Sequence, residues 1–321
     1  MVKRKKSKPV SSSRILKYIA WFLAFVIIIL SLLTTGYYFG YENAKKEIFQ
    51  ESKIEKTLLV QERRLEKNMQ EILNIKTSNY ISASHELDDT PLAKAPKMLK
   101  RKVKISPDKP MLAIIMDDVG TRSQVNAIKS LNFPLTMSFL PPSKARPNSA
   151  KLAAKEQLYM VHLPLEAQSF SAEEPNTLRI TDSQEIISRR IREIKEQFPK
   201  VLYINNHTGS KFTADELSVN RLIFALNTNN ISFIDSRTTA QTKVPKVLES
   251  FGLPYVARDV FLDHHMDKEY IKNQIKKAIK VAKNHGSAIA IGHPHANTIL
   301  ALNESKEILK EVNLVYIDKL R

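Results

Sequence analysis

The 321-residue sequence contains no cysteine and only seven glycines. Because cysteine is absent, the chain can form neither disulfide bonds nor thiolate metal sites, and this composition fits an oxidising compartment. No Gly-rich phosphate loop follows any apolar run, which removes the main support for a nucleotide-binding sheet. A metal site in this chain would therefore have to use histidine and carboxylate ligands.

Charge is unevenly distributed along the chain. The formal net charge is +17, of which residues 1–17 carry +7 and residues 94–109 carry +6. A basic balance raises the question of nucleic acid, but no nucleic-acid-binding motif accompanies these charges. Basic residues beside a membrane segment act instead as topology signals and contact anionic lipid. We therefore expect no nucleic-acid partner.

Residues 18–41 form a long apolar run without a charged side chain. About 20 apolar residues cross a bilayer as a helix, whereas a cleavable signal peptide usually has a shorter core and a small-residue cleavage site. The run predicts an uncleaved transmembrane helix, with a cleaved signal as the alternative. Since Lys and Arg crowd residues 1–17, this tail should be cytoplasmic. The sequence thus predicts a single-pass protein of the bacterial inner membrane with a periplasmic C-terminal domain.

The next segment, residues 42–76, has no Gly or Pro and mixes charges of both signs. We expect a helical stalk, and the seven-residue spacing of Leu58, Leu65 and Ile72 is compatible with a short coiled coil that would join two chains in a homodimer. The recurrence is short, so a solvated spacer helix is an equally good interpretation. Residues 77–108 lose the periodicity and collect prolines and a basic run, which predicts a linker.

Residues 109–321 alternate short apolar runs with longer amphipathic stretches, the pattern of parallel strands joined by helices. Eight strand candidates predict an α/β barrel, with an open doubly wound sheet as the alternative. Helix starts are expected where Asp182 precedes Glu185 and Thr213 precedes Glu216, two pairs that resemble capping boxes, and Gly286 should end a helix. The expected strands are residues 112–116, 135–140, 158–163, 201–205, 231–235, 255–257, 287–291 and 314–317.

Several of the apolar runs end on polar side chains. The first ends on Asp117 and Asp118, and later runs end on Asn205, Asn206, Asp235, His162, His207, His293 and His295. Because the carboxyl ends of parallel strands meet at one edge, these groups should lie together. Two adjacent acids alone could cap the following helix, and a single histidine is more often a core residue. Acids and imidazoles converging on one edge favour a metal-dependent hydrolase.

Seven motifs occur in order between Met111 and Ile317: IIMDDVG, VHLPLE, NTL, NNHTGS, FIDS, RDVFLD and IAIGHPH. Together they resemble the divergent polysaccharide deacetylase family, a remote branch of the NodB-like carbohydrate esterases. The resemblance covers nearly the whole of the C-terminal domain. It implies a distorted (β/α) barrel with a metal-dependent site at its mouth.

The resemblance also implies roles for individual residues. In NodB-like enzymes the first acid of the Asp-Asp pair is the general base and the second binds the metal, which maps onto Asp117 and Asp118. Those enzymes take two histidine ligands from one His-x-x-x-His stretch, but here the position four residues after His162 is Glu166. We expect His207 to supply the missing ligand.

The remaining candidates surround this set. The late histidine that serves the relatives as general acid matches His293, with His295 as the alternative. Three further residues are expected to orient His293 or Asp117, or else to form plain strand-end ion pairs: Asp235, Arg258 and Asp263. The two asparagines, Asn205 and Asn206, are expected to support the site or bind substrate.

The resulting prediction is a membrane-anchored hydrolase that uses Zn²⁺ or another divalent metal to remove N-acetyl groups from peptidoglycan or another envelope polysaccharide. The alternative is a catalytically silent glycan-binding or scaffold protein with the same fold. A glycosidase is a weaker possibility, because it needs two carboxylates roughly 5–9.5 Å apart across a sugar bond. Neighbouring residues on a regular strand point to opposite faces, which makes Asp117 and Asp118 a poor pair for that reaction.

Overall fold

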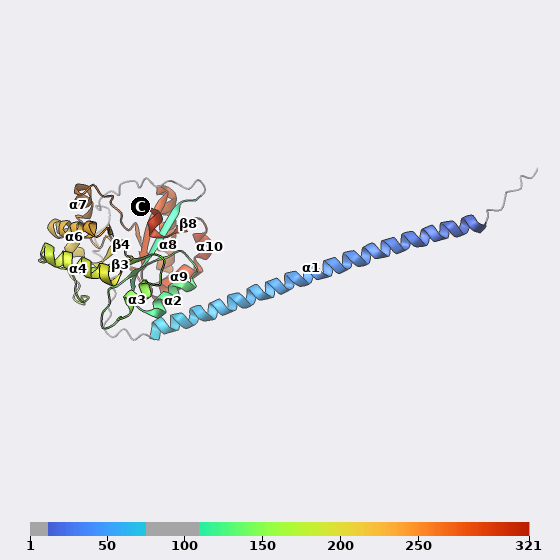
Figure 1. Ribbon diagram of the computed structural model, residues 1–321, viewed down its shortest axis with the longest axis horizontal. Helices are drawn as coiled ribbons and strands as arrows, with labels where there is room; N and C mark the ends of the chain where they lie inside the picture. The colour runs from blue at the N-terminus through green and yellow to red at the C-terminus, as the bar shows by residue number, and fades with distance from the viewer. Residues whose placement is uncertain (1–11, 75–108, 321) are drawn as a thin grey trace, which may run out of the picture. The chain divides into compact units, whose positions relative to one another are not determined.

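The computed structural model describes residues 12–74 and 109–320. Helix α1 (Ser12–Asn74) is continuous and contains the predicted apolar run (Figure 1). Within it, Leu16–Glu47 is long and apolar enough to cross a membrane, which is compatible with a membrane anchor or a signal sequence. Most of the predicted basic tail, the predicted linker and the stalk side chains Leu58, Leu65 and Ile72 lie outside the described residues.

In the C-terminal domain strands alternate with helices. The strands are β1 (Met111–Val119), β2 (Thr136–Phe139), β3 (Tyr159–Leu165), β4 (Tyr203–Thr208), β5 (Ser232–Ile234), β6 (Val260–Phe261), β7 (Ser287–Gly292) and β8 (Asn313–Val315). The helices are α2 (Arg122–Ser130), α3 (Ser149–Ala153), α4 (Gln184–Gln197), α5 (Ser210–Ala214), α6 (Glu216–Thr228), α7 (Val244–Ser250), α8 (Lys268–His285), α9 (Ala296–Glu304), α10 (Lys306–Leu309) and the 3₁₀ helix η3 (Ile317–Leu320). Figure 1 shows α4, α6 and α7 together on one flank of the sheet and α8, α9 and α10 on another.

The strands form one curled parallel sheet in the order β5-β4-β3-β2-β1-β7-β6. Strand β7 occupies one edge of β1 from Met111 to Met116, so β8 and β2 must share the other edge. The two ends of the sheet approach each other through an isolated parallel bridge between Asp235 and Ala257. The predicted distorted barrel is therefore confirmed.

The structure corrects several predicted boundaries. The sixth strand is Val260–Phe261, and within the predicted segment 255–257 only Ala257 forms a bridge. The eighth strand ends at Val315, because Ile317 already belongs to η3. The N-cap of α4 is Ser183 rather than Asp182, and that of α6 is Asp215 rather than Thr213. Gly286 does end α8, with the left-handed backbone that a C-terminal glycine commonly adopts.

Alternate side chains of the strands build two separate apolar layers, as the two-residue period of a strand requires. On β1, Leu112 and Ile114 pack toward the helices, whereas Ala113 and Ile115 point into the barrel. The inner layer also contains Met111, Met160, Tyr203, Ile234, Ile289, Ile291, Ile317 and Leu320. The polar residues in phase with these inner positions should enter the barrel mouth.

Candidate metal centre

Five buried polar residues continue the inner phase at the carboxyl ends of four strands. Asp117 follows Ile115 on β1, and His293 follows Ile291 after β7. His162 on β3 and the alternate residues Asn205 and His207 on β4 occupy the equivalent phase. All five are less than 4% exposed. The period of the strands therefore brings them to one place.

Asp118 joins this group through an irregular backbone. On a regular strand it would point away from the barrel, but it has a φ of 57° and the β1–β2 register shifts between Met116 and Val119. A left-handed non-glycine residue of this kind is uncommon and often marks a functional site. From the sequence, Asp117 and Asp118 are expected to point to opposite faces of a regular strand, and this expectation is wrong. Both carboxylates lie beside His162. The interpretation of the two acids as helix caps is also excluded, because the N-cap of α2 is Thr121.

The Asp118 carboxylate lies among three imidazoles. Its Oδ1 is 2.9 Å from His207 Nδ1 and 3.5 Å from His162 Nε2, and its Oδ2 is 3.6 Å from His293 Nε2. Burial alone would raise the pKa of Asp118, but His207 and the other imidazoles outweigh it and hold that pKa well below its usual range. Asp118 is therefore a carboxylate at neutral pH.

The donor set fits a divalent metal. One ligand atom from each of Asp118, His162 and His207 lies within 4.8 Å of the others. Metal bonds of about 2.0–2.1 Å in tetrahedral geometry place neighbouring ligand atoms roughly 3.3 Å apart, close to the distances from Asp118 Oδ1 to the two imidazoles. Burial lowers the pKa of His162 to about 3, although Asp118 opposes the shift, so this ring is neutral and able to bind a cation.

Asn205 connects this group to the predicted base. Its Nδ2 donates to both oxygens of Asp117, at 2.9 and 2.8 Å, and its Oδ1 accepts from Ser138 Oγ at 2.6 Å. Since that same Oδ1 lies 3.0 Å from His162 Nδ1, this nitrogen must be the donor, which leaves His162 Nε2 as a lone pair facing Asp118. Burial raises the pKa of Asp117 to about 7, with His293 and the Asn205 amide acting in the opposite direction.

His293 is held by Asp263 through both its ring and its backbone. Its Nδ1 lies 3.0 Å from Asp263 Oδ1, and its backbone N–H donates to Asp263 Oδ2 at 2.7 Å. Thr298 Oγ1 also donates to Asp263 Oδ2, at 2.7 Å. Burial alone would lower the pKa of His293, but Asp263 outweighs it and raises that pKa to about 9. His293 is therefore protonated at neutral pH and presents Nε2 toward Asp118, whereas His295 is only partly buried at the start of α9.

The structure places three of the expected supporting residues outside this group. Asn206 has the opposite strand phase and uses its Oδ1 to accept from the Ser236 backbone N–H. The Asp235 carboxylate accepts from Arg237 N, Thr242 and Tyr255. Arg258 donates to the backbone oxygens of Ser236 and Arg237 and lies over the ring of Phe261. These three residues hold the loop after β5 in place. Asn205 Nδ2 donates to Ser236 Oγ of that loop at 3.1 Å, which links the loop to the cluster.

Glu166 occupies the position where the resemblance to NodB-like enzymes implies a second histidine, and it makes other contacts here. Its Oε1 lies 2.7 Å from Lys211 Nζ, and its Oε2 accepts from the Ile180 backbone N–H at 2.9 Å. Glu166 thus joins the loop after β3 to α5, while His207 takes the place beside Asp118.

The sequence interpretation missed Ser138, Thr298 and Phe261. Ser138 is one of two polar residues in the fully buried strand β2, and a polar residue in a buried strand was the only sequence signal for it. Thr298 lies in the α9 sequence without a motif of its own. Phe261 stacks edge-on against His293 with ring centroids 5.5 Å apart, and it belongs to the strand that was predicted too early in the chain.

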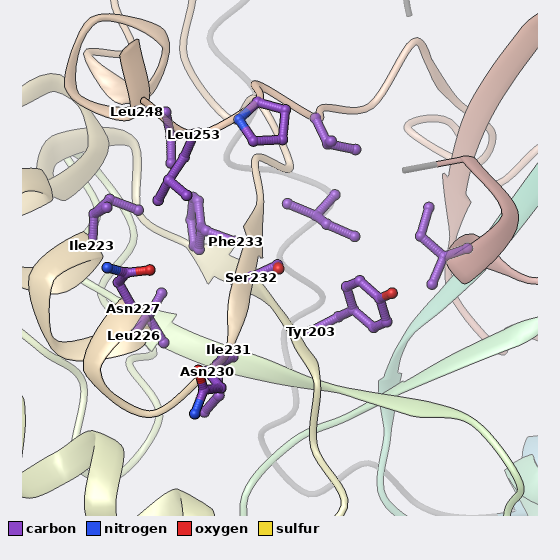
Figure 2. Close-up of a pocket in the computed structure, with 14 residues that line it drawn as sticks. Tyr203, Ile223, Leu226, Asn227, Asn230, Ile231, Ser232, Phe233, Leu248 and Leu253 are labelled. Atoms are coloured by element: carbon purple, nitrogen blue, oxygen red, sulfur yellow. The ribbon is translucent and has the colours of Figure 1, made fainter. Parts of the chain in front are cut away.

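A separate, mostly apolar cavity of about 260 Å³ lies along β5 and is lined also by residues of α6 and α7. Figure 2 shows Tyr203 and Ser232, the first residues of β4 and β5, among its lining residues. No member of the Asp/His cluster lines this cavity. This cavity is therefore separate from the Asp/His cluster.

The domain is a parallel α/β barrel, and a cluster of possible metal ligands lies at its mouth. The chain belongs to the divergent polysaccharide deacetylase family, whose model matches residues 114–321. It is 34% identical over 195 residues to the uncharacterized protein YibQ of Escherichia coli K12, a match that covers 60% of this chain and 61% of the relative. An uncharacterized protein of Haemophilus influenzae Rd is 32% identical over 204 residues, covering 62% of this chain and 72% of the relative.

A solved structure shows a similar fold. The uncharacterized protein ATU2773 of Agrobacterium tumefaciens C58 superposes with a TM-score of 0.58 at 17% identity. The alignment covers 67% of this chain and 91% of that protein. At this identity the likeness supports the barrel fold alone.

Proposed function

We propose that the chain is a metal-dependent hydrolase that removes N-acetyl groups from peptidoglycan or another envelope polysaccharide. The observation that carries the proposal is the convergence of Asp118, His162 and His207 beside Asp117 and His293. Membership of a deacetylase family supports an acetylated glycan as the substrate class. In the proposed organisation, residues 18–41 anchor a catalytic domain of residues 109–321 to the inner membrane through the stalk and the linker. Pairing of two stalks would give a homodimer.

Asp118, His162 and His207 are the proposed ligands of Zn²⁺ or another divalent cation. When bound, such a cation polarises a carbonyl and lowers the pKa of a coordinated water toward ~7. The carboxylate form of Asp118 and the neutral form of His162 both suit this role, because neither has to lose a proton near neutral pH.

The neighbouring residues are suited to the two proton transfers of amide hydrolysis. Asp117 is held by Asn205 with its carboxylate 3.6 Å from His162, so it lies within the cluster and can accept a proton from attacking water. His293 is protonated and can donate to the nitrogen of the departing amine as the C–N bond breaks. Water supplies the oxygen of the acetate, and the amine leaves with the donated proton.

Metal content and acetate release by the full chain in detergent test this proposal together. We expect about one divalent ion per chain and release of acetate from N-acetylated oligosaccharides or peptidoglycan fragments. A chain that binds metal and glycan strands but releases no acetate from either substrate would contradict the hydrolase and support a glycan-binding scaffold instead.

A further inference from the structure

A second hollow lies beside the proposed centre, on the loops that follow β1 and β2. It has a volume of about 440 Å³ and is lined by Gly120, Thr121, Arg122, Arg146, Lys151 and Lys155 among other residues. Gly120 comes two residues after Asp118, and two residues span at most ~7 Å of extended chain. The Gly120 end of the hollow therefore lies within ~7 Å of Asp118, just beyond the carboxyl end of β1.

The lining is basic, and one of its four cations is already neutralised. The Arg146 guanidinium pairs with Glu174 and donates from Nε to the Pro141 backbone oxygen at 3.2 Å. Among the described residues, no carboxylate lies within ion-pair distance of Arg122, Lys151 or Lys155. All three are exposed, so the hollow presents three uncompensated positive charges to solvent.

At the start of α2, side chains already occupy backbone N–H groups that line the hollow. The N–H groups of Gly120 and Thr121 donate to Gln124 Oε1 at 2.9 and 3.0 Å, and Thr121 Oγ1 accepts from Gln124 N. The start of α2 is thus already capped. Gly120 has a steric role, because a Cβ there would lie 2.6 Å from Arg146 Cδ. The absence of a Cβ at Gly120 leaves room for the Arg146 side chain, and the exposed cations of Arg122, Lys151 and Lys155 give the hollow its positive charge.

We propose that this hollow is a subsite for an anionic group, a carboxylate or a phosphate, carried by the glycan whose N-acetylated sugar lies at the Asp/His cluster. That the ligand is a glycan rests on the proposed function. Three cations within one hollow match a carboxylate or phosphate, whereas a neutral sugar would leave them unused. The subsite selects acidic envelope glycans over neutral polymers of N-acetylated sugars.

The test compares two triple variants of the full chain in detergent. The first replaces Arg122, Lys151 and Lys155 by Gln. The matched control makes the same change of net charge on the exposed face of α8, at Lys276, Lys277 and Lys280. Binding is measured for a neutral N-acetylglucosamine tetrasaccharide, a muropeptide with free carboxylates and a phosphorylated N-acetylglucosamine disaccharide.

Each exposed ion pair contributes only modestly to binding free energy, so the loss of three pairs with the anion should weaken its binding by roughly 3- to 100-fold. We expect this loss for the carboxylate or the phosphate probe in the Arg122/Lys151/Lys155 variant, with little change for the tetrasaccharide and in the α8 variant. The probe that responds identifies the anion. Equal losses in both variants would show a general charge effect and overturn the subsite, as would equal binding of neutral and anionic probes by the unmodified chain. Acetate release is scored separately: its absence beside selective anion binding would contradict the hydrolase and leave the subsite standing.

Discussion

His207 is the residue on which the proposed ligand set depends, because Lys211 engages Glu166 at the position where the resemblance to NodB-like enzymes implies a second histidine. His207→Ala should remove the bound metal from the full chain. The fold should change little, since the core lies in the two apolar layers rather than at the barrel mouth. Metal analysis and a urea unfolding curve check both expectations. His285→Ala, at the exposed end of α8, is the control. Retention of stoichiometric metal by His207→Ala would exclude this residue as a ligand.

Asp117→Asn separates proton transfer from metal binding. Asp118 and the two histidines are unchanged in this variant, so the metal should remain bound. Acetate release should fall by ~10² or more, the usual contribution of a general base. Metal content, glycan affinity and the rate of acetate release are measured on the same preparation. An undiminished rate in the Asp117→Asn variant would show that another group accepts the proton.

Glu166 offers a prediction about pH and stability. Burial alone would raise its pKa, but the Lys211 ion pair and the Ile180 N–H outweigh it and lower that pKa below 4.5 in the folded chain. A depressed pKa stabilises the folded state above the unfolded pKa, and this stabilisation disappears as the pH falls through the folded pKa. Glu166→Gln should therefore cost about 1 kcal/mol of unfolding free energy at pH 7 and progressively less in acid. Urea midpoints measured against pH test this, with exposed Glu249→Gln as the control. A cost independent of pH would contradict the electrostatic explanation.

The two-residue period of a strand is enough to tell, from the sequence alone, which residues of β4 face the cluster and which face away. Asn205 and His207 share the phase of the inner residue Tyr203, whereas Asn206 has the opposite phase. The position of Asp118 could not be obtained in this way. Its left-handed φ accompanies an irregular pairing of β1 with β2, and a residue within an apolar strand run gives no periodic signal for such a break.

Among the elements, the turn between β4 and α5 positions the proposed ligand His207. Gly209 has a φ of 97°, and a Cβ there would lie 2.9 Å from Leu165 Cβ. Gly252 also has a positive φ, but a Cβ added to it would have no atom within 4 Å. The two glycines share the conformational requirement and differ in the space around them.

This difference gives a prediction for two Gly→Ala variants. Gly252→Ala should cost about 1 kcal/mol, the strain of a left-handed alanine. Gly209→Ala should cost roughly 2–4 kcal/mol, because steric crowding against Leu165 adds to the same strain. Since the only tryptophan, Trp21, lies in α1, unfolding of the domain is best followed by pulse proteolysis in urea. Equal costs at the two positions would show that Leu165 moves aside freely.

Element boundaries were harder to predict than element types. All eight strands exist, because apolar runs of this length between amphipathic stretches specify buried parallel strands. The sixth was misplaced since Tyr255 and Ala257 are apolar and buried, yet the pairing with β7 forms only at Val260 and Phe261. The two predicted capping boxes also misplaced the helix starts by one or two residues. Asp182 accepts from Arg179 N, which leaves Ser183 to cap α4.

At the scale of the whole molecule, the proposed function requires the Asp/His cluster to reach the glycan outside the inner membrane. Helix α1 contains a stretch, Leu16–Glu47, that is long and apolar enough to cross a bilayer. The basic side chains on its N-terminal side predict a cytoplasmic tail by the positive-inside rule. The C-terminal domain should then be accessible from the periplasm.

Protease added to intact spheroplasts should digest the C-terminal domain, because it lies on the accessible side, while a cytoplasmic marker protein stays intact. A variant in which the seven Lys and Arg residues of positions 1–17 are replaced by Gln is the matched comparison, since it removes the topology signal and keeps the apolar run. We expect a protected fraction of the domain to appear in that variant, because the charge bias that orients the helix is lost. Immunoblotting of the domain before and after lysis with detergent measures the protected fraction. Complete protection of the domain in the unmodified chain, with the N-terminal tail cleaved instead, would reverse the topology and place the cluster out of reach of envelope glycan.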